Sequence, residues 1–240
     1  MATITNGNNG VNMLLDENTL RQIFRSSDAV CFDVDSTVCR DEAIDELAKF
    51  ANKEKEVMEM TRRAMRGGCS FHDALSKRLQ LIQPTVDMIN DYLRTHPPRF
   101  TPGIKELVSL LHANDVAVYL VSGGFYSIIE PVAKELHIPY KNIYANRIKF
   151  FYDGNYAGFD ETEPTCQQHG KAKVIAYLKN RYKYRMVTII GDGVTDMEAC
   201  PPADAFIGFG GNQIREKVKK EAKWFVTSFY DLIEELKVDS

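Results

Sequence analysis

The chain has 240 residues, enough for one large domain or for a domain that carries an insertion. Its 44% hydrophobic and 26% charged residues are typical of a globular protein and exclude a largely disordered one. The formal net charge of -3 argues against a nucleic-acid partner, because binding to phosphate backbones needs a basic surface. No apolar run approaches the roughly 18 to 20 residues of a membrane span, and the five cysteines are scattered as in reducing compartments. We therefore expect a cytoplasmic protein that binds neither nucleic acid nor membrane.

The amino-terminal part leads into a buried strand. Residues 1–12 are rich in Asn, Gly and Thr and predict a flexible tail, and residues 14–24 predict a short amphipathic helix. Residues 29–35 begin with a nearly continuous apolar run and contain two aspartates, Asp33 and Asp35. Such a run is typical of a strand in a parallel sheet, whose carboxyl end borders the ligand crevice. The two aspartates are thus candidates for chemistry, although aspartate also begins turns and caps helices.

Residues 41–97 predict one helix after another. Hydrophobic residues recur there at helical spacing, for example at Leu75 and Leu79. Gln83-Pro84 interrupts the pattern and His96-Pro97-Pro98 ends it. We interpret residues 41–97 as a helical cap inserted after the first core strand, and residues 13–40 and 98–240 as the core.

Strands alternate with helices after residue 98. Strands are expected at residues 116–121, 143–145, 186–190, 205–209 and 224–227, and helices at residues 103–111, 125–136 and 170–180, with one helix before the last strand and one after it. Asp153-Gly154 lies within an alternating segment and predicts a small β-hairpin appendage at about residues 147–160. The alternation predicts an α/β fold, a doubly wound, Rossmann-like parallel sheet core with an inserted helical cap.

Four segments place polar residues at strand ends or at the start of a helix. Asp33-x-Asp35-x-Thr37 and Ser122-Gly123-Gly124 follow two strands, Lys171 begins a helix, and Gly191-Asp192-Gly193-Val194-Thr195-Asp196 follows a third strand. Each segment alone has an ordinary structural explanation as a loop, a solvated lysine, a turn or a helix cap. Their joint placement on strand ends predicts an active site.

In these segments the sequence resembles the haloacid-dehalogenase-like phosphatases, and within them the branch that acts on O-phospho-L-serine. The resemblance runs from about Asp28 to Leu236 and is carried by residues 32–38, 60–65, 120–125, 156–160 and 191–204. It implies hydrolysis of O-phospho-L-serine to L-serine and phosphate, the last step of L-serine biosynthesis, with one Mg²⁺ in each active site. It also suggests a homodimer.

The resemblance assigns chemical roles to the four segments. Asp33 is the nucleophile that forms an aspartyl-phosphate, and Asp35 is the general acid and base. Mg²⁺ is held by the side chains of Asp33 and Asp192 and by the backbone carbonyl of Asp35, and Asp196 orients these ligands. The phosphate is bound by Lys171 and by the donors of Ser122, Gly123, Gly124 and Thr195. These are residue types that a hard cation and a phosphoryl group require.

The resemblance places substrate selection in the cap. Glu42 matches the partner of the substrate ammonium group, Arg78 the partner of its carboxylate, and Met65 an apolar contact. Arg66 stands where the family usually has glycine, and its backbone N–H is expected near the ligand. Without the resemblance, Glu42 and Arg78 would be read as surface charges of helices.

Two other functions stay open at this point. The same scaffold could transfer the phosphoryl group to an acceptor such as homoserine, or it could be a catalytically silent binding module. The presence of Asp33, Asp35, Lys171 and Asp192 argues against the silent module. His169 lies close to Lys171 in the sequence and is expected in a surface loop.

Overall fold

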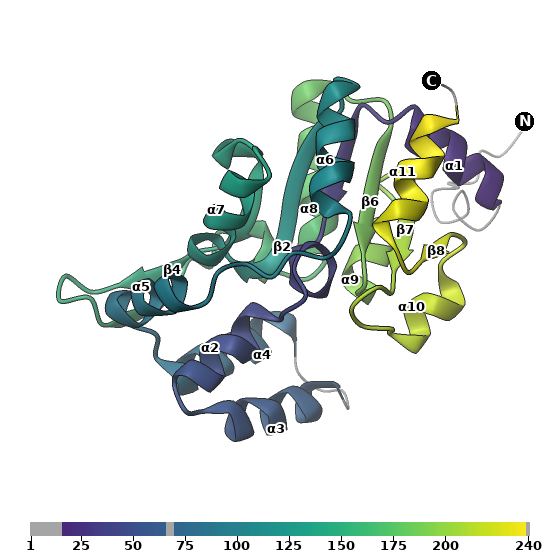
Figure 1. Cartoon of the computed structure of the whole chain (residues 1–240). Helices are drawn as coiled ribbons and strands as arrows, with labels where there is room; N and C mark the ends of the chain where they lie inside the picture. The colour runs from purple at the N-terminus through teal and green to yellow at the C-terminus, as the bar shows by residue number, and fades with distance from the viewer. Residues whose placement is uncertain (1–15, 66–69, 239–240) are drawn as a thin grey trace, which may run out of the picture.

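A computed structural model describes residues 16–65 and 70–238, so the predicted tail at residues 1–12 lies outside the described residues. Its centre is a six-stranded sheet in the order β3-β2-β1-β6-β7-β8, with every neighbouring pair parallel. The strands are β1 (Ala29–Phe32), β2 (Ala117–Phe125), β3 (Ile143–Asn146), β6 (Val187–Gly191), β7 (Ala205–Phe209) and β8 (Phe225–Val226). The predicted doubly wound parallel sheet is confirmed (Figure 1).

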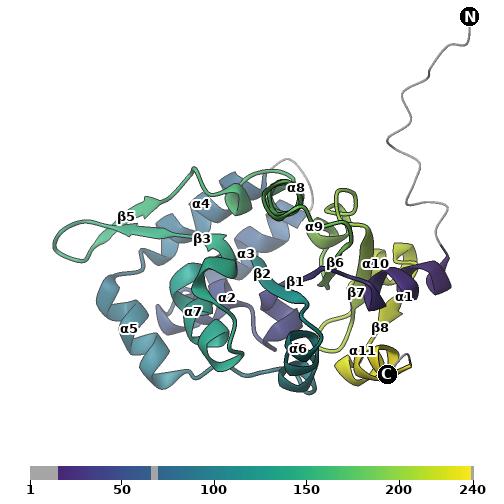
Figure 2. The ribbon, with the colours of Figure 1, turned by 90° about the horizontal axis from the view of Figure 1, so that it is seen from above.

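Helices cover both faces of this sheet. One face packs against α1 (Glu17–Arg25), α6 (Ile104–Ala113), α7 (Tyr126–Glu135) and α11 (Phe229–Lys237). The other face packs against α8 (Gly170–Tyr182), α9 (Val194–Met197) and α10 (Glu216–Glu221). Seen from above, α6 and α11 lie on one side of the strands and α8 lies on the other (Figure 2). Burial on both faces explains the nearly continuous apolar runs of the central strands.

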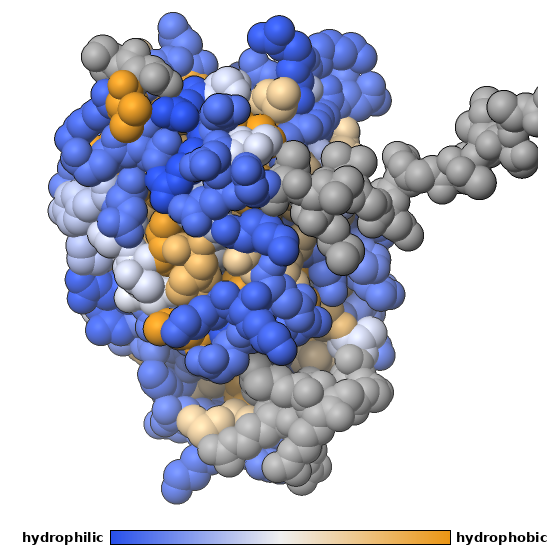
Figure 3. Space-filling model, turned by 90° about the vertical axis from the view of Figure 1, so that its right-hand side faces the viewer, coloured by the Kyte–Doolittle hydropathy of each residue, from blue (hydrophilic) through white to orange (hydrophobic). Residues whose placement is uncertain are grey.

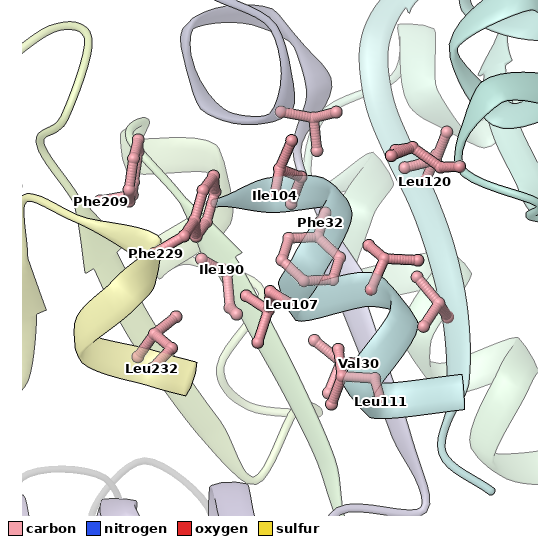
Figure 4. Packing of buried hydrophobic residues seen from close by; sticks show 14 of the residues in the cluster. Val30, Phe32, Ile104, Leu107, Leu111, Leu120, Ile190, Phe209, Phe229 and Leu232 are labelled. Carbon is pink, nitrogen blue, oxygen red and sulfur yellow. The ribbon is translucent and has the colours of Figure 1, made fainter. Parts of the chain in front are cut away.

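Aromatic side chains fill the core between β1, β7 and α11 (Figure 4). Phe209 and Phe229 stack with their ring centroids 4.3 Å apart. Phe32 meets the same Phe229 ring edge to face, at 6.1 Å. Both geometries are favourable for aromatic pairs, so Phe229 connects the first strand to the carboxyl-terminal helix.

Four helices follow the first strand, as expected. They are α2 (Ala43–Phe50), α3 (Glu54–Met65), α4 (Phe71–Ile82) and α5 (Val86–Thr95), here called the helical segment. Figure 1 shows α2, α3 and α4 below the sheet and α5 at the left, beside β4 (Ile148–Phe150). The side chains of Ser70 and Thr85 cap α4 and α5 by accepting backbone N–H groups, which satisfies donors that a helix start leaves free. Leu47, Leu75 and Leu79 of the segment belong to a separate hydrophobic cluster that also includes Phe125 of β2 and Phe159 of β5 (Tyr156–Phe159).

The two connections between the helical segment and the sheet run side by side. Arg40 N donates to Arg99 O at 2.9 Å, and Thr101 N donates to Val38 O at 2.9 Å. The segment therefore joins the core through one paired, two-stranded neck.

The predicted hairpin consists of β4 (Ile148–Phe150) and β5 (Tyr156–Phe159), which are antiparallel. It projects from the body in Figure 1. Gly154 O at its turn accepts the backbone N–H of Val86, at 3.0 Å. This bond holds the hairpin tip against the start of α5.

Several predicted boundaries are wrong, and two of the errors fall at strand ends. The first strand ends at Phe32 instead of residue 35, because the chain turns sharply through η2 (Val34–Val38), where Ser36 has a positive φ of 55°. The second strand continues past residue 121 to Phe125, with an irregular stretch before its end. The first helix begins at Glu17, where the Asp16 side chain caps it. The short helix α9 and the single turns η3 (Tyr140–Asn142) and η4 (Pro164–Cys166) were not predicted.

Hydrophilic residues cover most of the face that Figure 3 shows. Within residues 16–65 and 70–238, no helix has both the length and the apolar content that crossing a bilayer requires.

Replacing Phe229 with alanine should lower the free energy of unfolding by about 3–5 kcal/mol, because the ring is buried and its removal leaves a cavity beside two other rings. Urea unfolding followed by circular dichroism measures this loss. Tyr152→Ala, which removes a fully exposed ring at the hairpin tip, is the control and should change the midpoint little. Equal midpoints for the two variants would contradict the packing described here.

Candidate active site

Three strand ends and the start of one helix bring polar residues to a single cavity of about 550 Å³. Phe32 of β1 lies in register with Leu120 of β2 and with Ile190 of β6. Because the strands are parallel, the residues that follow these three meet at the same edge of the sheet. Asp33, Gly123, Gly124 and Asp192 consequently line the cavity together with Lys171 at the start of α8.

The Lys171 ammonium group lies between two carboxylates. Its Nζ is 2.9 Å from Asp33 Oδ1 and 2.7 Å from Asp196 Oδ1, and all three residues are buried. Burial disfavours the charged form of lysine, but the attraction of Asp196 and Asp33 outweighs it and raises the pKa of Lys171. Lys171 is therefore a fixed positive charge at the bottom of the cavity.

Close backbone packing sets the position of Lys171. A Cβ atom on the preceding Gly170 would lie 2.1 Å from the carbonyl oxygen of Pro164 in η4. Any side chain at position 170 would push the start of α8 away from η4, so glycine is required there.

Asp33 and Asp35 have different surroundings although they are two residues apart. Asp33 Oδ1 accepts the Val34 backbone N–H at 2.7 Å and lies beside Lys171. Asp35 is half-buried, and its Oδ1 accepts the backbone N–H of Ala43 at 3.1 Å. Burial, with the nearby charges of Glu42 and Asp33, raises the pKa of Asp35 well above its usual range. Asp33 thus lies beside a cation, while the surroundings of Asp35 favour its protonated form.

The aspartates form a donor set for a metal ion. One carboxylate oxygen from each of Asp33, Asp192 and Asp196 lies within 4.8 Å of the others, and all three residues are buried. Burial and the charge of Asp33 raise the pKa of Asp192 although Arg215 and Lys171 oppose the shift, so these two cations do not fully offset the clustered acidic groups. A divalent cation would add positive charge there, and carboxylate oxygens are the ligands that hard cations prefer.

Arg215 is a cavity residue that the sequence analysis missed. Its Nε donates to Asp192 Oδ2 at 2.6 Å, and one of its terminal nitrogens donates to Glu42 Oε1 at 2.9 Å. These bonds connect an aspartate of the sheet edge to the helical segment. Nothing in the surrounding sequence marks Arg215, because its role depends on the folded position of the loop before α10.

Most of the predicted site residues reach this cavity. Glu42, Asp35, Arg78, Gly123, Gly124 and Thr195 line it. Ser122 is buried behind the glycines, where its Oγ accepts the Gly124 backbone N–H at 2.9 Å. Met65 is the last residue of α3, and Arg66 lies outside the described residues.

Two further residues line the cavity, although the sequence analysis did not assign them to the site. His169, expected in a surface loop, lines the cavity with part of its surface, while its side chain remains 55% exposed. Phe71 of α4 also lines the cavity, and a Cβ atom added to Gly123 would lie 2.9 Å from its ring. The helical segment therefore touches the last residues of β2 directly.

Comparisons with known proteins agree with this arrangement. A family model described as haloacid dehalogenase-like hydrolase matches residues 27–204. The phosphoserine phosphatase of Rattus norvegicus is 58% identical over 223 residues, which cover 93% of this chain and 99% of the rat protein. A solved structure titled DsGPDH of Dunaliella salina has a TM-score of 0.81 and 35% identity, and covers 93% of this chain and 38% of its own. The structure of a phosphoserine phosphohydrolase-like protein from Francisella tularensis has a TM-score of 0.74 and 31% identity, and the match covers 86% of this chain and 98% of the Francisella chain.

Proposed function

Because the chain belongs to the haloacid dehalogenase-like hydrolase family, we propose that it is a phosphoserine phosphatase, which hydrolyses O-phospho-L-serine to L-serine and phosphate as the last step of L-serine biosynthesis. The observation that carries this proposal is the convergence of Asp33, Asp35 and Lys171 in one cavity. The 58% identity to the rat enzyme over nearly its whole length supports the substrate.

Asp33 acts as the nucleophile. A carboxylate oxygen of Asp33 forms a bond to phosphorus while the bond between phosphorus and the serine oxygen breaks, which leaves an aspartyl-phosphate. Lys171 lies 2.9 Å from Asp33 Oδ1, where its charge can also stabilise the equatorial oxygens of the transferring group. The donors of Ser122, Gly123, Gly124 and Thr195 bind the same oxygens.

Asp35 transfers the protons of both steps. Its raised pKa keeps a proton on the carboxyl group, and that proton passes to the serine oxygen as the ester bond breaks. The resulting carboxylate then takes a proton from the water that attacks the aspartyl-phosphate. Phosphate leaves, Asp33 is regenerated and Asp35 is protonated again, so the cycle is balanced.

The donor set fits Mg²⁺, which prefers oxygen ligands and usually takes one or two carboxylates. The side chains of Asp33 and Asp192 and the backbone carbonyl of Asp35 would hold it, and a bound Mg²⁺ would offset the repulsion between the Asp33 carboxylate and the phosphoryl group. Both oxygens of Asp196 are already engaged, by Lys171 and by the backbone N–H of Gly193. These two bonds support a role for Asp196 in orienting its neighbours.

The helical segment acts as the cap that selects the substrate. Glu42 and Arg78 both come from it and line the cavity, where they bind the ammonium and carboxylate groups of phosphoserine. Met65 supplies an apolar contact, and Arg66 supplies a backbone N–H. On this division, residues 41–97 form the cap and residues 13–40 and 98–240 form the core.

We also infer a cytoplasmic location and a homodimer. Three of the described cysteines, Cys31, Cys39 and Cys166, are free and buried, which fits a reducing compartment. The homodimer rests on the family resemblance alone.

A substrate panel tests the reaction, its specificity and its metal requirement together. The enzyme should release phosphate from O-phospho-L-serine when Mg²⁺ is present, lose this activity in a chelator and recover it when Mg²⁺ is restored. Asp33→Asn should abolish turnover and keep the wild-type circular dichroism spectrum, because the amide is a far weaker nucleophile. Steady hydrolysis by Asp33→Asn, or transfer to added homoserine that exceeds hydrolysis, would contradict the proposal.

Arg78→Ala should raise KM for O-phospho-L-serine by about tenfold to a hundredfold, because a charge-assisted bond to the substrate carboxylate is lost. KM for p-nitrophenyl phosphate, which has no carboxylate, should change little. The control is Arg94→Ala on α5, whose guanidinium pairs with Asp91 at the surface. An equal rise in KM on both substrates would show that Arg78 has only a structural role.

A further inference from the structure

Strand β2 bulges where it borders the active site. Its pairing with β3 matches Val121 with Tyr144 and then Phe125 with Asn146, so four residue steps along β2 correspond to two along β3. The extra length lies in Ser122, Gly123 and Gly124, the loop that the proposed function assigns to phosphate binding. Bulges beside active sites commonly redirect backbone groups in this way.

A buried bulge leaves backbone groups without strand partners, and each such group needs another hydrogen bond. The side chain of Asn146, which is 0% exposed, supplies one. Its Nδ2 donates to the carbonyl oxygen of Gly123 at 2.8 Å. Its Oδ1 accepts the hydroxyl of the buried Thr165 at 2.8 Å. Asn146 thus ties the loop to β3 and to η4.

The peptide unit between Gly123 and Gly124 is held at both of its ends. Asn146 binds the Gly123 carbonyl, and Ser122 Oγ accepts the Gly124 N–H at 2.9 Å. Because a trans peptide is planar, the bond to the carbonyl also fixes the direction of the N–H. A hydroxyl that accepts one hydrogen bond retains its own hydrogen for donation, so the Ser122 hydroxyl stays available to a phosphoryl oxygen.

The loop also passes close to Asp35. A Cβ atom on Gly124 would lie 2.9 Å from Asp35 Oδ2 and 3.1 Å from Ser122 Oγ. Because the Gly124 N–H is bound to Ser122 Oγ, a small rotation of the Gly123–Gly124 peptide would move the Ser122 hydroxyl relative to the general acid. Misplacement of such groups by about 1 Å can cost a factor of a hundred in rate.

We propose that Asn146 is a positioning residue, which holds the loop of Ser122, Gly123 and Gly124 in the geometry that stabilises the transferring phosphoryl group. This inference rests on the proposed function. Thr165 supports Asn146 and belongs to η4, the same turn that packs against Gly170 beside Lys171. One short element thereby fixes both the backbone donors and the lysine relative to each other.

The chain contains a matched control for this hydrogen bond. Asn142 is also buried, 8% exposed, and its Nδ2 donates to the carbonyl oxygen of Val118 at 2.9 Å. This bond has the same chemistry and the same acceptor strand, β2. Its acceptor, Val118, lies four residues before Ser122 and does not line the cavity. Loss of either asparagine removes one buried side-chain bond to a β2 carbonyl.

The test compares Asn146→Ala with Asn142→Ala. For each variant, kcat and KM are measured with O-phospho-L-serine and with p-nitrophenyl phosphate, and Tm is measured as a control for stability. Inhibition by orthovanadate is also measured, because orthovanadate mimics the five-coordinate phosphorus of the transition state. Asn146→Ala should lower kcat by about 10- to 100-fold on both substrates and weaken orthovanadate inhibition by a similar factor. Its KM should change less than about threefold, since KM reports mainly the ground state. Asn142→Ala should lower Tm and keep kcat within about twofold.

Thr165→Val keeps the test decisive if Asn146→Ala does not fold. Loss of this hydroxyl should lower kcat by about threefold to tenfold, the equivalent of one hydrogen bond. If both single variants fold, the double variant should lose no more than Asn146→Ala alone, because Thr165 acts through Asn146.

Equal kcat values for Asn146→Ala and Asn142→Ala would overturn the inference, and so would an unchanged kcat in Thr165→Val. A wild-type enzyme that hydrolyses p-nitrophenyl phosphate but not O-phospho-L-serine would instead refute the proposed substrate. In that case the aryl phosphate and orthovanadate measurements would still decide the role of Asn146.

Discussion

The structure depends on the placement of one buried ammonium group between carboxylates. Lys171 lies within 2.9 Å of Asp33 and 2.7 Å of Asp196, and this cation offsets part of the cost of placing several acidic groups in one cluster. Glycine at position 170 permits the approach of α8 to η4 that brings Lys171 there. The sheet positions the other residues of the site, because the carboxyl end of β1 lies beside β2 and β6 in a parallel register.

The site also joins the two parts of the molecule. Glu42 belongs to the helical segment and Asp192 to the sheet edge, and Arg215 binds both. The substrate ammonium group is expected to bind Glu42, and the metal ion is expected to bind Asp192. Each would therefore bring positive charge to a carboxylate that Arg215 also binds. Arg215 therefore links the two parts through charge, and the paired neck at Arg40 and Arg99 joins them through backbone hydrogen bonds.

The sequence predicted the features that depend on local pattern. Alternating strands and helices indicated the sheet, Asp153-Gly154 indicated the hairpin, and the family motifs indicated Asp33, Lys171 and Asp192. The sequence did not reveal Arg215, Phe71 or Asn146, because their contacts arise only when distant segments meet. The end of the first strand was misplaced for a related reason: no glycine or proline at residues 33–38 marks a turn, and only the folded chain shows the turn at Ser36.

The central claim is that the phosphoryl group is transferred first to Asp33 and then to water. Rapid acid quenching of the enzyme during turnover of O-phospho-L-serine, followed by peptide mass spectrometry at low pH, tests this directly. The account predicts a phosphoryl group on the peptide that contains Asp33, formed within the first turnover and removed by hydroxylamine, as expected for an acyl phosphate. A phosphoryl group on any other side chain, or turnover with no phosphorylated peptide at the shortest quench times, would contradict it.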